Sequence, residues 1–298
     1  MDKYGLAPKK GYGQNFLINS AIPERIAGSA AAGGDVGFDG FGGFMEGVCA
    51  LEIGPGIGSM TVELSSYFEK VIAVEIDKGL IPLLEETLAE CDNVTVVNED
   101  FMNVQADALL SELAGDMPVC VCANLPYYVT TPVLMKLLEE YPLSGPSRFR
   151  SITVMVQTEV ADRICASAGS GDYGSLSVSV ALHGTAEKLF TVSAGNFLPA
   201  PKVSSSVVQI TLHENGIYDV WDKAPKDKAA CDKFAAREKK LIALAFLQRR
   251  KTLVNALSSE IPKEKTEAAL SELGIRSDIR GEKLSARDYC ALAAILYK

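Results

Sequence analysis

The chain has 298 residues, of which 48% are hydrophobic, with one tryptophan and a formal net charge of −9. This composition excludes a disordered chain and fits one or two packed domains. No apolar run is long enough to span a membrane and residues 1–4 do not resemble the start of a signal peptide, so we expect a cytoplasmic protein.

The elements expected in the first 170 residues alternate between apolar strands and amphipathic helices. Strands that are apolar almost throughout indicate a parallel sheet covered on both faces, which predicts an α/β fold of the Rossmann type. In chain order we expect a helix at 21–32, a Gly-rich loop at 33–47, a strand at 48–53, a helix at 59–67, a strand at 71–75, a helix at 80–90, strands at 94–97 and 119–123, a helix at 133–141, a strand at 151–156 and a helix at 159–166.

The pattern changes in the last third of the chain. Segments 175–183, 187–192 and 203–212 are typical of β-rich or mixed structure, and the proline-containing segment 197–202 of a rigid connector. Helical patterns then follow at 233–246, 252–257, 263–273 and 286–297. We therefore expect two domains, a Rossmann-like catalytic domain at 1–214 and a small all-α domain at 215–298.

Cysteine and histidine usage limits the chemistry. The seven cysteines are scattered and include no Cys-x-x-Cys pair, which is typical of reduced thiols in the cytosol. The two histidines, His183 and His213, lie in or beside apolar runs, where a hydrogen-bonded structural role is expected. We therefore expect no metal site and no histidine-centred catalytic triad.

Charge is distributed unevenly along the chain. Residues 1–220 contain 12 Lys and Arg against 27 Asp and Glu, whereas residues 221–298 contain 17 against 11. A basic segment on an acidic protein favours a partner rich in phosphate, because Lys and Arg gain by displacing its counterions. The alternative is a solvated helical surface.

The first chemical motif is a glycine turn between a strand and a helix. Gly54 and Gly56 follow the strand at 48–53, and Glu75 ends the next strand, where its carboxylate can accept both hydroxyls of a ribose. Spacing alone would fit NAD nearly as well. Glu52 favours S-adenosylmethionine instead, because a carboxylate there would repel a pyrophosphate but attract a sulfonium or an amino group.

A third acidic residue follows the strand at 94–97. Asp100 can accept the amine of an adenine, and Phe101 beside it can pack against the ring. For Asp100 and Glu52 the alternative role is to cap a helix.

The most informative motif is the tetrapeptide Asn124-Leu125-Pro126-Tyr127, directly after the strand at 119–123. The Asn124 side-chain oxygen and a neighbouring backbone carbonyl can accept both hydrogens of an exocyclic amine. Pro126 has no N–H to compete, and Tyr127 offers a face on which a base can stack. The alternative is an ordinary strand-to-helix turn capped at Thr130 or Thr131.

Together these motifs resemble the KsgA-type (RsmA) small-subunit rRNA adenine N6,N6-dimethyltransferases over essentially the whole chain. The matching segments are Gly13-Gln14-Asn15-Phe16-Leu17, Glu52-Ile53-Gly54-Pro55-Gly56-x-Gly58, Val74-Glu75-Ile76-Asp77, Asn124-Leu125-Pro126-Tyr127, Phe197-x-Pro199-x-Pro201-Lys202-Val203 and Phe246-Leu247-Gln248-Arg249-Arg250-Lys251-Thr252-Leu253. The resemblance implies an S-adenosylmethionine-dependent enzyme that dimethylates two adjacent adenosines near the 3′ end of small-subunit rRNA, with the 30S particle as partner. It is expected to act as a monomer.

The resemblance, the chemistry of the motifs and the basic charge of the last third of the chain together imply roles for individual residues. The target adenine is expected at Asn124, Leu125, Pro126 and Tyr127. Cofactor contacts are expected at Gln14, Asn15, Leu17, Glu52, Gly54, Gly56, Glu75, Ile76, Asp100, Phe101 and Asn124. RNA contacts are expected at Lys202, Arg249, Arg250 and Lys251, although the last three could instead be basic residues at the end of a helix.

Three other functions remain open on the sequence. The nearest is an Erm-type 23S rRNA adenine methyltransferase, which is disfavoured because Leu125 stands where we expect Ile in those enzymes. A ribosome-assembly factor that acts mainly by binding is compatible with the basic segment. An NAD-dependent dehydrogenase is disfavoured by Glu52 and by the motif at Asn124.

Overall fold

The computed structural model describes residues 15–33, 44–140 and 148–297. The chain divides into two compact units, the first formed by Met1–Glu140, Arg148–Ala161 and Ala186–Leu212, and the second by Tyr141–Ser147, Asp162–Thr185 and His213–Lys298. The second unit thus includes a segment that precedes the predicted boundary between residues 214 and 215. The assignment of catalysis to 1–214 and of RNA binding to 215–298 stays a prediction.

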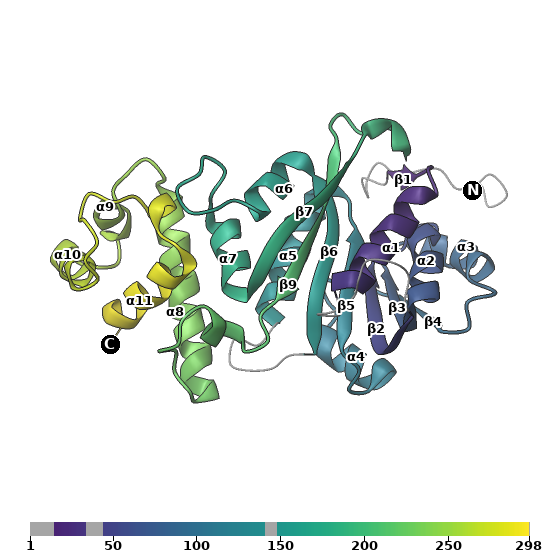
Figure 1. Ribbon diagram of the computed structural model, residues 1–298, viewed down its shortest axis with the longest axis horizontal. Coiled ribbons are helices and arrows are strands. Elements are labelled where there is room, and N and C mark those ends of the chain that lie inside the picture. The colour runs from purple at the N-terminus through teal and green to yellow at the C-terminus, as the bar shows by residue number, and fades with distance from the viewer. Residues whose placement is uncertain (1–14, 34–43, 141–147, 298) are drawn as a thin grey trace. The chain divides into compact units, whose positions relative to one another are not determined.

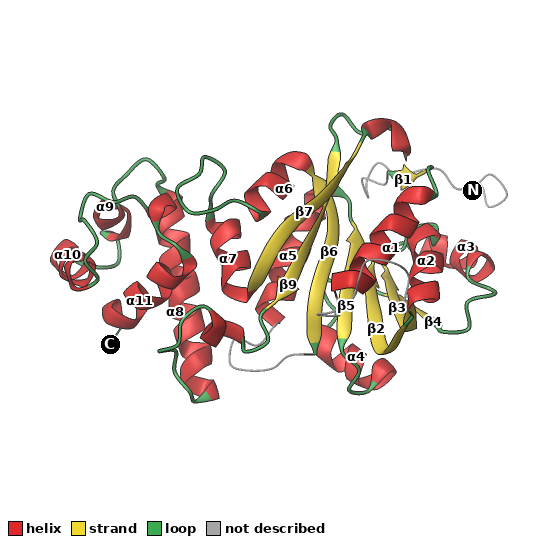
Figure 2. Cartoon of the chain, viewed as in Figure 1, coloured by secondary structure: helices red, strands yellow, loops and turns green. Residues whose placement is uncertain are grey.

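The main sheet has seven strands in the order β4-β3-β2-β5-β6-β9-β7 (Figures 1 and 2). The strands are β2 (Met45–Ile53), β3 (Phe68–Glu75), β4 (Val94–Asn98), β5 (Val119–Asn124), β6 (Phe149–Gln157), β7 (Gly184–Val192) and β9 (Ser205–Leu212). The first five strands in spatial order pair in parallel, and β9 pairs antiparallel with β6. A separate antiparallel pair joins β1 (Phe16–Leu17) to β8 (Phe197–Leu198).

Helices cover the sheet in the first unit. They are α1 (Ala21–Gly33), α2 (Ser59–Tyr67), α3 (Ile81–Thr87), α4 (Ala106–Ala114), α5 (Tyr127–Glu140) and the start of α6 (Thr158–Ile164). In β2, Cys49, Ala50 and Leu51 are consecutive and all fully buried, so both faces of the sheet are covered, as expected for a parallel sheet. Within the described ranges, no helix is both long and apolar enough to cross a membrane.

Helix α1 packs closely on one face of the sheet because it presents small residues. Ala27, Ala30 and Ala31 are fully buried in one cluster with Cys120 and Cys122 of β5. The two cysteines share a face of the strand, since side chains two residues apart point the same way. The prediction that these thiols are buried is confirmed for this pair, and none of the seven cysteines forms a disulfide.

The predicted start of the helix after the tetrapeptide is wrong. Helix α5 begins at Tyr127, not at 133, because the Pro126 carbonyl accepts hydrogen bonds from the Val129 N–H (3.0 Å) and the Thr130 hydroxyl (3.2 Å). The alternative of a helix cap at Thr130 or Thr131 is wrong as well, because both residues lie inside α5. The turn of the tetrapeptide is shorter than expected, and Tyr127 itself is helical.

The second unit contains helices at α7 (Ser175–His183), α8 (Lys228–Leu247), α9 (Leu253–Leu257), α10 (Lys263–Glu272) and α11 (Ala286–Leu296). Segment 175–183 was expected to be β-rich or mixed, because Val and Ser alternate there. It is helical because Val178 and Leu182, four residues apart, are both buried in the core of this unit. Helix α8 begins five residues before the predicted start, where the Asp227 side chain accepts a hydrogen bond from the Ala230 N–H (2.9 Å).

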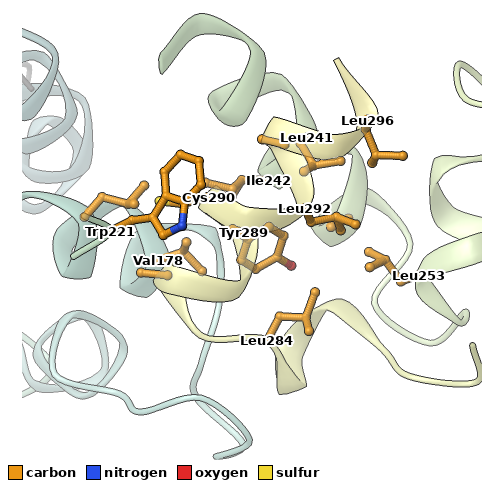
Figure 3. Packing of buried hydrophobic residues seen from close by; sticks show 14 of the residues in the cluster. Val178, Trp221, Leu241, Ile242, Leu253, Leu284, Tyr289, Cys290, Leu292 and Leu296 are labelled. Carbon is orange, nitrogen blue, oxygen red and sulfur yellow. The ribbon is translucent and has the colours of Figure 1, made fainter. Parts of the chain in front are cut away.

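Tyr289 lies at the centre of the second unit's core (Figure 3). Its side chain is fully buried among those of Leu241, Leu253 and Leu292, and its hydroxyl donates to the Gly281 carbonyl at 2.9 Å. Burial raises the pKa of this phenol, so it remains a neutral donor at physiological pH. The hydrogen bond ties the turn at Gly281–Lys283 to helix α11.

Gly281 is expected to tolerate no side chain. A Cβ atom there would lie 2.8 Å from the Tyr289 hydroxyl and 3.1 Å from the Ala245 Cβ. Gly281→Ala should therefore destabilise the protein by about 1–3 kcal/mol, measured by urea unfolding. In a Tyr289→Phe background the same substitution should cost less, because the nearest clashing atom is gone. Equal costs in both backgrounds would contradict this account.

Candidate functional site

The order of the strands reverses at β2, which has β3 on one side and β5 on the other. Open parallel sheets bind ligands at such a reversal, in the crevice outside the carboxyl ends of the strands. Strand β2 ends at Ile53, which lies opposite Ala123 of β5. Gly54 and Asn124 therefore leave the sheet side by side at this crevice.

A cavity opens at this edge of the first unit, and the predicted site residues gather around it. All the predicted cofactor and catalytic residues in the described part of the chain line the cavity, namely Asn15, Leu17, Glu52, Gly54, Gly56, Glu75, Ile76, Asp100, Phe101, Asn124, Leu125, Pro126 and Tyr127. Gln14 lies outside the described residues. The roles of these residues stay predictions, but the fold brings them to one place.

The glycine turn needs glycine chiefly for its backbone conformation. Gly54 and Gly56 have φ angles of 73° and 59°, in the left-handed region that favours glycine. A Cβ on Gly56 would lie 3.3 Å from Cε1 of Phe16, and one on Gly54 would lie 3.4 Å from Cδ2 of Leu125. The turn thus exposes bare backbone to the cavity between two apolar side chains.

Glu75 is held in a fixed orientation by the backbone around it. Its carboxylate accepts hydrogen bonds from the Gly56 N–H (3.0 Å) and from the Asp77 N–H (2.8 Å). Burial raises its pKa, and these backbone hydrogen bonds act in the opposite direction. A carboxylate has about four acceptor positions, so acceptor capacity remains for a ligand. This geometry suits the predicted contact with ribose hydroxyls.

Glu52, unlike Glu75, receives no hydrogen bond from the described residues around it. Its side chain is 1% exposed, and neither carboxylate oxygen accepts a hydrogen bond from any described residue. Its pKa is raised to about 8, chiefly by burial and to a smaller extent by the charge of Glu75. The nearby Thr61 hydroxyl lowers it, although that hydroxyl is also buried and lies outside hydrogen-bonding geometry. A buried carboxylate without a partner is costly unless a ligand supplies a cation.

The alternative capping roles are wrong for both acidic residues. Glu52 lies inside β2 and caps no helix. Oδ1 of Asp100 accepts the Met102 N–H at 2.9 Å and closes a turn rather than a helix. No described residue donates to its other oxygen. Phe101, beside it, is buried and lines the cavity.

The tetrapeptide contributes one free amide and one anchored ring. The Asn124 side chain makes no hydrogen bond to any described residue, although it lines the cavity. The Tyr127 hydroxyl shares a 2.9 Å hydrogen bond with the buried Ser205 hydroxyl at the start of β9. The ring of Tyr127 is therefore fixed beside an amide that has its full hydrogen-bonding capacity available.

Sequence reasoning missed several residues that line the cavity. Phe197 reaches it because β8 pairs with β1, with Leu17 opposite Phe197. Tyr128 also lines the cavity and is 60% exposed. No local pattern indicates the contact of Phe197, which depends on pairing between distant segments. Tyr128 could have been identified, because it is the second residue of the helix that the tetrapeptide opens.

The predicted RNA contacts differ from one another in the structure. Lys202, in the first unit, is exposed. Arg250 and Lys251 are exposed in the turn after α8, and their side chains form no hydrogen bond or ion pair with any described residue. Arg249 is engaged within its own unit, because its guanidinium donates to the carbonyls of Tyr173 (2.9 Å) and Gly171 (3.2 Å). A role of Arg249 in RNA binding would have to coexist with this structural one.

The two histidines do not line the cavity. His183 Nδ1 lies 2.6 Å from the Ser179 carbonyl oxygen and His213 Nε2 lies 3.4 Å from the Ala181 carbonyl oxygen, so their predicted structural role is confirmed. Among the residues that the structure describes, no group of three or more His, Cys, Asp or Glu side chains could hold a metal.

The groups that line the cavity fit S-adenosylmethionine. The unpaired Glu52 carboxylate suits a cationic ligand, and Glu75 presents oriented acceptors suited to a ribose. Bare backbone at Gly54 and Gly56 permits close approach of a ligand. The pyrophosphate of NAD would meet the Glu52 carboxylate instead, so NAD fits this cavity less well.

Comparison with known proteins agrees with this chemistry. The profile of the family "Ribosomal RNA adenine dimethylase" matches residues 5–298. A "Ribosomal RNA small subunit methyltransferase A" of Lachnoclostridium phytofermentans is 41% identical, and the alignment covers 99% of this chain and 94% of that protein. The protein of the same name from Bacillus cytotoxicus is 40% identical, with the same shares covered.

Solved structures show the same fold. A dimethyladenosine transferase from Plasmodium falciparum superimposes with a TM-score of 0.69 at 23% identity, over 93% of this chain and 95% of that one. The 23S rRNA methyltransferase ErmE superimposes with a TM-score of 0.64 at 24% identity, over 95% of this chain and 100% of that one. The fold is therefore the Rossmann-like fold of these methyltransferases, and the chain belongs to the ribosomal RNA adenine dimethylase family.

Proposed function

We propose that this protein transfers methyl groups from S-adenosylmethionine to the N6 amines of two adjacent adenosines near the 3′ end of small-subunit rRNA, during assembly of the 30S particle. The observation that carries the proposal is that the Asn124 amide and the Glu52 carboxylate line the same cavity and that neither has a hydrogen-bond partner among the described residues. Relatives about 40% identical that are named small-subunit methyltransferases support the choice of RNA. We further propose that the protein acts in the cytoplasm as a monomer.

When bound, S-adenosylmethionine supplies a methyl group activated by a positively charged sulfur. Glu52 would face the cationic part of this donor, and Glu75 would hold the ribose. Asp100 has one carboxylate oxygen without a described partner, which can accept the adenine amine, with Phe101 against the ring. These assignments give each polar group of the cavity a ligand group of matching chemistry.

The target adenine would be held by the tetrapeptide. Its N6 nitrogen is a weak nucleophile, because the lone pair is delocalised into the ring. Acceptance of its two N–H groups by the Asn124 oxygen and the Leu125 carbonyl would localise that lone pair and aim it at the methyl carbon. Tyr127, fixed by Ser205, would stack on the base after it leaves the RNA stack, at a cost of a few kcal/mol.

Catalysis in this scheme depends on position rather than on a strong base. Holding the reacting atoms about 3–3.5 Å apart supplies much of the rate through effective molarity. The amine becomes acidic once it is alkylated and can lose its proton to water. After the first transfer only one N–H remains, so the cavity must then accept a methyl group beside Asn124.

An Erm-type activity is the second candidate. It shares the fold, as the superposition with ErmE indicates, but that similarity at 24% identity concerns the fold alone. A role in ribosome assembly by binding is compatible with the methyltransferase activity.

We prefer activity on small-subunit RNA to activity on 23S rRNA, because the relatives about 40% identical carry the small-subunit name. The experiment below compares small-subunit particles with 23S rRNA.

Mass spectrometry of RNA after incubation with S-adenosylmethionine tests the function. The wild-type protein should dimethylate small-subunit particles and leave 23S rRNA unmodified. Asn124→Ala should lower turnover at least about a hundredfold, because aligned hydrogen bonds at the reacting group are lost, while donor binding persists. Tyr127→Phe keeps the ring and loses one hydrogen bond, so it should lower turnover less than about tenfold. Near-normal turnover of Asn124→Ala would remove the role assigned to Asn124.

Donor binding should depend on pH through Glu52. Its pKa is raised to about 8, so the free protein holds a proton there at neutral pH, and a cationic donor must displace it. Donor affinity should therefore rise between pH 6 and 8, by up to about tenfold per unit, and level off above pH 8. Calorimetry in buffers of different ionisation enthalpy measures both the affinity and the released proton.

Two variants control the pH experiment. Glu52→Gln should bind the donor more weakly, with a nearly flat profile and no proton release from this position. Glu46→Gln removes an exposed carboxylate of the same strand, outside the cavity, and should keep the wild-type profile. A wild-type pH profile in Glu52→Gln would show that another group is responsible.

A further inference from the structure

A second cavity lies within the second unit and is not explained by methyl transfer. Its lining combines cations with aromatic and small apolar residues and includes no carboxylate. The lining residues are Trp221, Lys223, Pro225, Ala230, Lys233, Phe234, Arg237, Ala293, Ala294 and Tyr297. Lys233 and Arg237 are four residues apart on α8, so they lie on the same face of the helix.

Three aromatic side chains line this cavity, and one of them is partly accessible. The rings of Trp221 and Phe234 stack with centroids 5.4 Å apart and an interplanar angle of 19°. Both are more than nine-tenths buried, and Figure 3 shows the Trp221 indole among residues of the unit's core. Tyr297 is half-buried, and the guanidinium of Arg237 lies 5.6 Å from the centroid of its ring. Tyr297 is therefore the ring that a ligand can contact beside these cations, whereas Trp221 and Phe234 belong to the packed core that borders the cavity.

The cations at this cavity are largely uncompensated. Lys223 and Lys233 are exposed and form no ion pair or hydrogen bond with any described residue. Arg237 donates to the Tyr297 carbonyl at 2.7 Å, which uses one of its five N–H donors. Three positive charges thus surround an opening whose lining includes no anion among the described residues.

The aspartates that neighbour these lysines in sequence do not neutralise them. Asp222 pairs with Arg287 at 3.8 Å, and Asp227 caps α8 through the Ala230 N–H. Asp232 is exposed, and none of the three lines the cavity. The positive charge at the opening therefore remains available to a ligand.

We propose that this cavity binds a single-stranded segment of the RNA substrate, with phosphates at Lys223, Lys233 and Arg237 and a nucleobase against the half-buried ring of Tyr297. Cations that track a phosphate chain beside aromatic surface are the usual means of binding unpaired RNA without sequence preference. An acidic peptide would satisfy the cations, but it would not need the ring of Tyr297. This inference rests on the proposed function, which makes RNA the substrate, and adds a second contact to it.

The chain contains a single tryptophan, and it lies in this cavity, so its fluorescence reports on this site directly. Titration with a single-stranded RNA of about ten nucleotides should change the emission of Trp221, while anisotropy of a labelled RNA measures total binding. Lys223→Gln/Lys233→Gln should weaken RNA binding at least about tenfold at low salt. It should also make the slope of log K against log salt shallower by about 1.4, since each phosphate contact contributes about 0.7.

The matched control is Lys263→Gln/Lys265→Gln, which removes two exposed lysines from α10 of the same unit and makes the same change in net charge. It should leave the affinity and the salt slope within about twofold of the wild type. Equal weakening by both double variants would overturn the proposal in favour of a general effect of charge. RNA binding without any change in Trp221 emission would also overturn it, as would an equal response to polyglutamate.

These outcomes are separate from a failure of the proposed function. The fluorescence and anisotropy measurements need no methyl donor and no turnover. If the wild-type protein methylates small-subunit RNA but Trp221 does not respond, only this second contact is wrong. If Trp221 responds and small-subunit RNA is not methylated, the proposed reaction is wrong, but the proposed RNA contact at the second cavity is supported.

Discussion

The register between β2 and β5 is the constraint on which the site depends. Ile53 lies opposite Ala123 and Glu52 opposite Cys122, so the glycine turn and Asn124 leave the sheet at the same level. A slip of one residue would move every side chain of a strand to the other face and separate these groups. Packing holds the register, because the small side chains Ala50, Cys120 and Cys122 lie beneath helix α1 in one buried cluster. Larger residues at these positions would push α1 away from the sheet.

Two carboxylates at this edge show how differently burial can be used. Glu75 is buried but receives two backbone hydrogen bonds, so its orientation is set before any ligand arrives. Glu52 is buried without a hydrogen-bond partner among the described residues. Because its pKa is raised from 4.5 to about 8, ionising it costs about 5 kcal/mol more than ionising an exposed glutamate, at about 1.4 kcal/mol per pKa unit. A cationic ligand that pairs with Glu52 would recover part of this energy. The same residue type thus serves as a fixed acceptor in one position and as a buried acid without a hydrogen-bond partner among the described residues in the other.

The sequence was sufficient to predict the parallel strands and most of the cavity, because apolar runs and the residues after them are local patterns. It was not sufficient where contacts between distant segments decide the structure. The β-like alternation in 175–183 becomes a helix because Val178 and Leu182 are buried in the core of the second unit. Phe197 lines the cavity only because β8 pairs with β1, about 180 residues earlier in the chain. Arg249 was predicted from its charge, but the Gly171 and Tyr173 carbonyls that engage it come from another segment.

Formal charge also overestimates the cations that the second unit can offer to RNA. Several of its basic side chains are already engaged in the described structure: Lys240 with Glu260, Arg249 with backbone carbonyls and Glu282, Arg276 with Asp278, Lys283 with the Gly169 carbonyl and Arg287 with Asp222. Exposed pairs of this kind contribute little to stability, but each must be broken or shared before its cation can contact a phosphate. No internal pair has to be broken for Lys223 and Lys233 at the second cavity, or for Arg250 and Lys251 after α8. The phosphate contacts that we propose for this unit therefore depend on which cations lack an internal partner, and net charge alone does not identify them.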